Sequence, residues 1–171
     1  MKNNRGLSYV ELLVVIGVMI LVVGISALSM SLISRNNATK MGDKMVTMLR
    51  KARTTSLAKG SENGAFHIRK VGNNYECAVG DINEIIANKE IEFETIGSGV
   101  QLYYYNPSDG LMPIVPSDGT VTSKFSQSNG SVISCSIGSE ILDSFSIYKN
   151  EEPAVRIMLY EVTGKCEMML E

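Results

Sequence analysis

The spacing of hydrophobic and polar residues divides this chain into three parts. The first is a run from Leu12 to Ser34 that contains no charged residue. A helix rises about 1.5 Å per residue and a bilayer core needs about 20 residues, so this run is long enough to cross a membrane. The run therefore predicts a membrane helix, and Glu11 directly precedes it.

A second pattern follows in residues 35–59, where apolar residues return every three or four positions among polar ones. The positions that share one helical face are Met41, Met45, Met48, Leu49, Ala52 and Ser56. They predict an amphipathic helix that continues the apolar run without a proline. We expect its methionines to pack in a core rather than to bind a metal. Gly60 and Gly64 predict the end of the helix.

Beyond Gly60 the apolar residues alternate with polar ones, as they do in strands. Short β-branched and aromatic runs predict strands at 65–71, 75–79, 91–93, 100–105, 132–137, 145–148 and 155–162. Residues 82–90 fit either a strand or irregular structure. We therefore expect an α+β fold, in which a long N-terminal helix, half membrane-spanning and half amphipathic, packs on a mostly antiparallel β-sheet head of residues 60–171.

Glu11 needs an explanation, because a carboxylate in a membrane helix costs about 2 to 3 kcal/mol and marks a functional site by default. A secretory signal peptide has a shorter apolar core and a small-residue cleavage site, such as the one near Ala27. An ordinary signal anchor fits the length but gives no reason for the glutamate. The residues just before the run favour a third interpretation.

Gly6, the apolar Leu7 and a glutamate at the fifth position counted from Leu7 resemble the class III leader of type IV pilins and type II secretion pseudopilins. The family usually has Phe in place of Leu7 and often Pro in place of Leu28. The resemblance implies a pilin-like fold with a leader of residues 1–6, a transmembrane and filament-core helix half at 7–34, and an amphipathic half at 35–59. It also implies cleavage between Gly6 and Leu7 by a prepilin peptidase, and N-methylation of Leu7. Glu11 would then be the assembly residue, paired with the new amino group of a neighbouring subunit.

Charge is distributed as unevenly as hydrophobicity. Residues 35–59 contain seven Lys or Arg and one acid, a balance of +6, whereas residues 60–171 contain seven basic and sixteen acidic residues, a balance of −9. Basic residues on the two sides of the apolar run nearly balance, so the positive-inside rule does not orient the chain. The leader resemblance implies a single-pass protein of the cytoplasmic membrane with its head outside the cytoplasm, and later an extracellular or periplasmic filament. We expect the basic stretch to lie near lipid phosphates or acidic neighbouring heads, and nucleic acid is the less favoured partner.

Three cysteines would meet an oxidising compartment there. Cys77, Cys135 and Cys166 could form one disulfide, with the pairing left open. No CxxC pair occurs and His67 is the only histidine, so the sequence predicts no metal site, no cofactor and no catalytic residue. His67 alternates with apolar neighbours in a strand-like stretch, which favours a structural or surface role. We therefore expect that the protein is not an enzyme.

The tetrapeptide Pro-Ser-Asp-Gly occurs twice, at 107–110 and at 116–119. Clustered aspartates could bind calcium, which takes oxygen ligands. Pro, Asp and Gly are each favoured in turns for their own backbone reasons, so we interpret both segments as turns.

Three short segments narrow the resemblance. Leu49 to Ala58 with Arg53, Val121 to Gly130 with Phe125, and Arg156 to Lys165 with Thr163-Gly164 resemble parts of GspH/FimT-type minor pseudopilins and pilins. Arg53 could pair with an acid on the sheet or stay solvated.

The expected function is therefore that of a minor structural subunit of a type IV pilus or type II secretion pseudopilus. Its expected partners are other pilin or pseudopilin subunits, the prepilin peptidase and the inner-membrane assembly platform. The alternative is a membrane-anchored extracellular binding module that does not polymerise. The sequence does not choose among secretion, DNA uptake, motility and adhesion systems.

Overall fold

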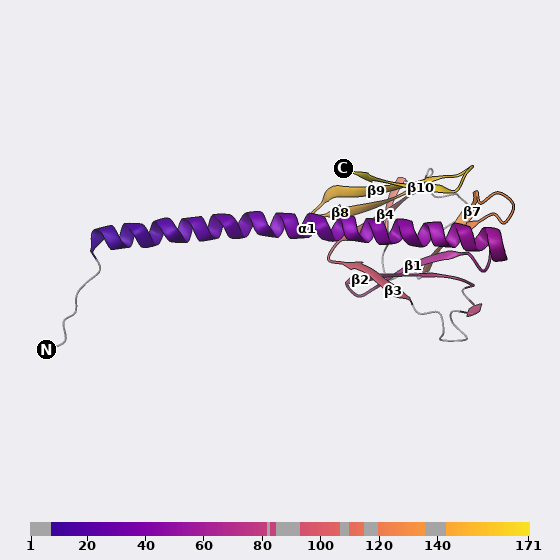
Figure 1. Ribbon diagram of the computed structural model, residues 1–171, viewed down its shortest axis with the longest axis horizontal. Helices are drawn as coiled ribbons and strands as arrows, with labels where there is room; N and C mark the ends of the chain where they lie inside the picture. Colours follow the sequence, from indigo (N-terminus) through magenta and orange to yellow (C-terminus); the bar gives the residue numbers. More distant parts are fainter. Residues whose placement is uncertain (1–7, 82, 85–92, 107–109, 115–119, 136–142) are drawn as a thin grey trace. The chain divides into compact units, whose positions relative to one another are not determined.

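The computed structural model describes residues 8–81, 83–84, 93–106, 110–114, 120–135 and 143–171 (Figure 1). Its helix α1 has the bounds Tyr9–Lys59, and the side chains of α1 are described at residues 9–24 and 36–59. The chain divides into two compact units, Met1–Arg35 and Asn36–Glu171. The second unit contains the strands.

Glycine ends α1, as the sequence predicts. Gly60 has a φ of +102°, and its N–H donates to the carbonyl of Ser56 at 2.9 Å. The side-chain amide of Asn63 donates to the carbonyl of Lys59 at 3.0 Å, which satisfies one of the carbonyls that a helix end leaves unpaired.

The strands of the described residues form two antiparallel sheets of five. Sheet A has the order β3-β2-β1-β6-β7, made of Glu94–Ser98, Asn74–Val79, Phe66–Val71, Thr120–Phe125 and Val132–Cys135. Sheet B has the order β10-β9-β8-β4-β5, made of Lys165–Leu170, Glu152–Tyr160, Ser144–Lys149, Gln101–Asn106 and Gly110–Pro113. Figure 1 shows β1, β2 and β3 on one side of residues 36–59 of α1, and β8, β9 and β10 on the other.

Residues 36–59 bury one helical face in the core of this unit. Of the predicted apolar face, the fully buried members are Met41, Met45, Leu49, Ala52 and Ser56, and Met48 is half-buried against them. Gly97 in β3 admits Met41, because a Cβ on Gly97 would lie 2.6 Å from the Met41 sulfur. Gly42 leaves room for sheet B to pack closely on the helix, because a Cβ there would lie 2.8 Å from the Met168 sulfur. The helix therefore contacts both sheets through glycine positions.

The predicted fold class is wrong in its sheet. We expected one mostly antiparallel sheet, whereas the strands divide between two. The chain leaves sheet A after β3, turns at Gly99 with a φ of +66°, and begins sheet B with β4. Alternation along a strand records that one face is buried, but it does not record which distant strand becomes the neighbour. The sequence pattern also misplaced β3, which it set at 91–93, and it missed β5, β6 and β10.

The predicted fold class is also wrong in its helix. Among the residues that the structure describes, no helix is long and apolar enough to cross a membrane. The described apolar part, residues 9–24, is short and includes Glu11, and residues 36–59 carry charges throughout. The described residues therefore contain no membrane-spanning helix, and two sheets replace the expected single one.

Candidate functional site

The start of α1 is closed by two hydrogen bonds of Ser8, one to the Glu11 carboxylate and one from the backbone of Val10. The backbone N–H of Ser8 donates to Glu11 Oε2 at 2.9 Å, and the N–H of Val10 donates to Ser8 Oγ at 3.2 Å. This is a capping box, in which two side chains accept the N–H groups that a first helical turn leaves unpaired. The helix dipole also favours a negative charge at this position. The Ser-x-x-Glu spacing is the signal by which the sequence could have identified Ser8.

The helical residues that follow Glu11 expose apolar side chains on all sides. Every described side chain from Tyr9 to Gly24 is exposed, with Ile20 at 68% and Val23 at 69%. A helix that is apolar all round requires an apolar environment, either a membrane or other protein. This surface, residues 9–24, and the capped carboxylate at its start form the candidate functional site.

Several predicted positions lie outside the described residues. Gly6 and Leu7 are among them, so cleavage and N-methylation stay predictions. The two Pro-Ser-Asp-Gly segments fall largely outside as well, at 107–109 and 116–119. In the part of the chain that the structure describes, no cluster of three or more His, Cys, Asp or Glu could hold a metal ion.

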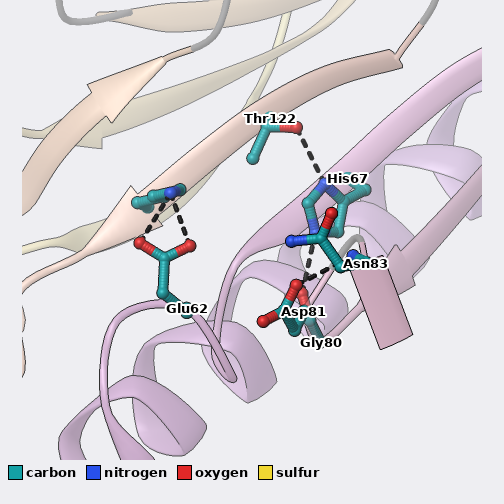
Figure 2. Close-up of polar contacts among 7 residues, drawn as sticks. Glu62, His67, Gly80, Asp81, Asn83 and Thr122 are labelled. Carbon is teal, nitrogen blue, oxygen red and sulfur yellow. Dashed lines mark hydrogen bonds and ion pairs between the residues drawn. The ribbon is translucent and has the colours of Figure 1, made fainter. Parts of the chain in front are cut away.

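His67 is a buried residue of β1, and both of its ring nitrogens have partners (Figure 2). Nε2 lies 2.8 Å from the carbonyl oxygen of Gly80, and Nδ1 lies 2.8 Å from Thr122 Oγ1. A carbonyl can only accept, so Nε2 carries the proton, and Nδ1 of the neutral ring accepts from the Thr122 hydroxyl. Burial lowers the pKa of His67, although the Gly80 carbonyl opposes this effect.

The charged residues near His67 have other partners than the ring. The ammonium of Lys124 donates to Glu62 Oε1 at 2.7 Å, and the backbone N–H of Asn83 donates to Asp81 Oδ1 at 2.8 Å. Figure 2 shows Glu62, Asp81 and Asn83 beside His67. With 1% of its surface exposed, His67 is closed to a substrate. Its contacts join β1 to β6 and to the residue after β2, which is a structural role.

Two of the three cysteines are buried free thiols. Cys77 lies in sheet A and Cys166 in sheet B, and the side chain of Cys135 lies outside the described residues. Burial raises the pKa of Cys77 to about 12 and that of Cys166 to about 11. Both thiols are therefore protonated at neutral pH and are poor nucleophiles. Any disulfide within this chain would have to include Cys77 or Cys166, and both are free, so the structure does not form the predicted disulfide.

Three segments that the sequence singled out meet at Arg53. The guanidinium Nε of Arg53 donates to the carbonyl of Gly130 at 3.3 Å. Gly164 closes against the same carbonyl, since a Cβ on Gly164 would lie 1.7 Å from the Gly130 oxygen and 3.2 Å from Arg53 Cδ. We call these three residues the Arg53 clasp. The sequence left Arg53 either paired with an acid or solvated, and the structure gives it a half-buried bond to the backbone instead.

The basic residues of 36–59 differ in their partners. Lys44 is 3.5 Å from Glu94, a pair in which both side chains are about half exposed, so it contributes little to stability. Lys40, Arg50, Lys51 and Lys59 are exposed. These exposed basic residues are compatible with contacts to acidic groups of a neighbouring molecule, and residues 36–59 form no defined binding site for an anion.

No family model, no curated protein and no solved structure matches this chain.

Proposed function

We propose that this chain is a minor structural subunit of a type IV pilus or type II secretion pseudopilus. In this proposal a prepilin peptidase cuts between Gly6 and Leu7 and methylates Leu7. The apolar run from Leu12 to Ser34 then holds the subunit at the cytoplasmic membrane, with its head outside the cytoplasm, until the assembly platform passes it to a filament. The other subunits of the filament are its partners.

One observation carries the proposal. A single carboxylate, Glu11, stands at the start of a wholly exposed apolar surface, five residues after a glycine that precedes a large apolar residue. Apolar burial between subunits would supply most of the affinity, and the charge of Glu11 would fix the alignment against the amino group of a neighbour. Oε2 of Glu11 accepts from Ser8, and a carboxylate has further lone pairs for a second partner.

Processing is tested by N-terminal sequencing of the protein from cells that contain the peptidase. We expect the chain to begin at methylated Leu7, and the same chain from cells without the peptidase to keep Met1. An uncut chain, or a cut near Ala27, in the cells with the peptidase would refute the proposal. An uncut chain would favour the non-polymerising binding module.

The capping box provides a competing explanation of Glu11, and matched variants separate the two roles. Glu11→Gln keeps an oxygen that can accept from Ser8 but removes the charge, whereas Glu11→Ala removes both. Ser8→Ala removes the acceptor for Val10, at a cost of about 1 kcal/mol to the helix start, and leaves the charge in place.

If the charge acts in assembly, both Glu11 variants insert into the membrane and are incorporated into filaments at least about tenfold less, because tenfold corresponds to about 1.4 kcal/mol of lost pairing. Ser8→Ala is then incorporated almost as well as the unchanged chain. Incorporation is measured as the ratio of the subunit in sheared filaments to that in membranes. Normal incorporation of Glu11→Gln together with a loss in Ser8→Ala would assign Glu11 to the cap alone.

A further inference from the structure

The outer strand of sheet B, β10, has one unpaired edge among the described residues. It pairs with β9 alone, from Lys165 opposite Tyr160 to Leu170 opposite Val155. The N–H of Glu171 continues this ladder by donating to the carbonyl of Ala154 at 3.2 Å.

This bond determines which backbone groups face outward. Hydrogen-bonded positions alternate along an antiparallel pair, so Glu171, Met169, Glu167 and Lys165 direct their backbone toward β9. The N–H and C=O groups of Cys166, Met168 and Leu170 therefore point to the free edge. The other side of β9 agrees, because the N–H of Leu159, opposite Cys166, donates to Asp143 at the start of β8.

The other three sheet edges are interrupted. β5 is four residues long and ends in Pro113, which has no N–H. β3 and β7 each pair with a shift in register, between Tyr75 and Glu76 in one ladder and between Lys124 and Phe125 in the other. Proteins protect their edges by such means. β10 has six residues in regular register, and it exposes Leu170 at 67% and Met169 at 46%.

A groove of about 470 Å³ lies between this edge and α1. It is lined by Asp43, Val46 and Arg50 of the helix and by Glu167, Met168 and Met169 of β10. Its apolar wall is made by Val46, Met168 and Met169, and its charged lining residues are Asp43, Arg50 and Glu167. An added strand would place every second side chain in the groove, over that apolar wall.

We propose that β10 is a self-association surface, on which a second copy of this chain adds its own β10 antiparallel across a two-fold axis at Met168. The two five-stranded sheets would then form one sheet through the dimer. Each copy would place Leu170 in the groove of its partner. This contact is a second surface, separate from residues 9–24, and it does not depend on the proposed function.

Charge selects the register centred on Met168. In that register Lys165 lies opposite Glu171 of the second copy, twice by symmetry, and Glu167 lies opposite Met169. Moving the axis by one residue toward Lys165 sets Glu167 opposite its own copy, and moving it by one toward Glu171 sets Glu167 opposite Glu171. Like charges directly opposite one another are destabilising, and opposite charges are stabilising. Larger shifts shorten the pairing.

The charges concerned already alternate in sign within one copy. Arg156 binds Glu171 at 2.8 Å, and Lys165 is paired with Glu167. The second copy would join these two pairs into one network of four charges, with no like charges directly opposite one another. Isologous contacts of this kind are the commonest in soluble oligomers.

The test uses the full chain in mild detergent, with sedimentation analysis of the monomer and dimer. Lys165→Glu and Glu171→Lys should each weaken the dimer, by about five- to thirtyfold for two cross-strand pairs, and the double exchange should restore it. Leu170→Pro should abolish it, because the introduced proline removes an outward N–H and leaves the ladder to β9 intact. Exchange of Lys44 and Glu94, an exposed pair of sheet A, is the control and should change nothing.

A zero-length amine-to-carboxylate cross-linker gives a positional readout. In a mixture of isotopically labelled and unlabelled chains, we expect a mixed cross-link between Lys165 and Glu171. A chain that stays monomeric, or a dimer that is insensitive to Leu170→Pro and to both charge reversals, would overturn the proposal. The second outcome would assign association to the apolar residues 9–24 instead.

Discussion

Among the described glycines, Gly164 is the one at which an added Cβ would make the shortest contact. It lies in the turn between β9 and β10 with a φ of +61°, and a Cβ there would lie 1.7 Å from the carbonyl oxygen of Gly130. Gly72, in the turn between β1 and β2, has a φ of +58°, and a Cβ there would meet nothing within 4 Å. The two variants Gly164→Ala and Gly72→Ala therefore require the same backbone conformation, and they differ in what the added Cβ contacts.

The expected effects follow from these geometries. Both variants force alanine into the left-handed region, at a cost of about 1 to 2 kcal/mol. Gly164→Ala must also displace the Gly130 carbonyl, and overpacking of this kind costs about 1 to 3 kcal/mol more. The displaced carbonyl leaves its bond from Arg53, which adds about 1 kcal/mol. We expect Gly164→Ala to lower the free energy of unfolding by about 2 to 4 kcal/mol more than Gly72→Ala does.

Urea unfolding of the full chain in mild detergent measures this difference, with tyrosine fluorescence as the signal. The two variants and the unchanged chain should have similar slopes against urea, so that the midpoints report stability. If Gly164→Ala falls within about 0.5 kcal/mol of Gly72→Ala, which is the ordinary range for surface substitutions, the Arg53 clasp contributes nothing and the reasoning is wrong.

Three further predictions concern buried groups of the head. Because the pKa of His67 is lowered in the folded state, the unfolded chain binds a proton at this residue first as the pH falls. We therefore expect the free energy of unfolding to decrease below about pH 6.5. In urea midpoints measured at successive pH values, His67→Gln should reduce this dependence on pH. Tyr75→Phe should cost about 1 to 3 kcal/mol in thermal or urea unfolding, because the Tyr75 hydroxyl of sheet A accepts the buried backbone N–H of Leu102 in sheet B at 3.0 Å. Burial raises the pKa of Cys77 to about 12 and that of Cys166 to about 11, so both thiols should resist iodoacetamide at pH 8 in the native state and react after denaturation. Mass spectrometry follows the labelling. Labelling of either thiol in the native protein would contradict its burial.

Features that depend on neighbouring residues could be predicted from the sequence. The end of α1 at Gly60 and the buried stripe through Met41, Met45 and Leu49 follow from local spacing, and the structure confirms both. The Ser-x-x-Glu spacing at the helix start is equally local. The structural role of His67 was one of the two predicted for it, yet its partners lie 13 and 55 residues away and could not be named.

What the sequence by itself determined is the apolar run, the single glutamate before it, the amphipathic stripe, and the existence of six of the ten described strands. Each of these is set by side chains within a few positions of one another, where the periods of helix and strand apply directly. Only the tertiary structure decided that the strands form two sheets, that β10 is an uninterrupted edge, and that Arg53 binds Gly130, 77 residues away. Pairing over such distances depends on how the whole core packs, and no local period carries that information.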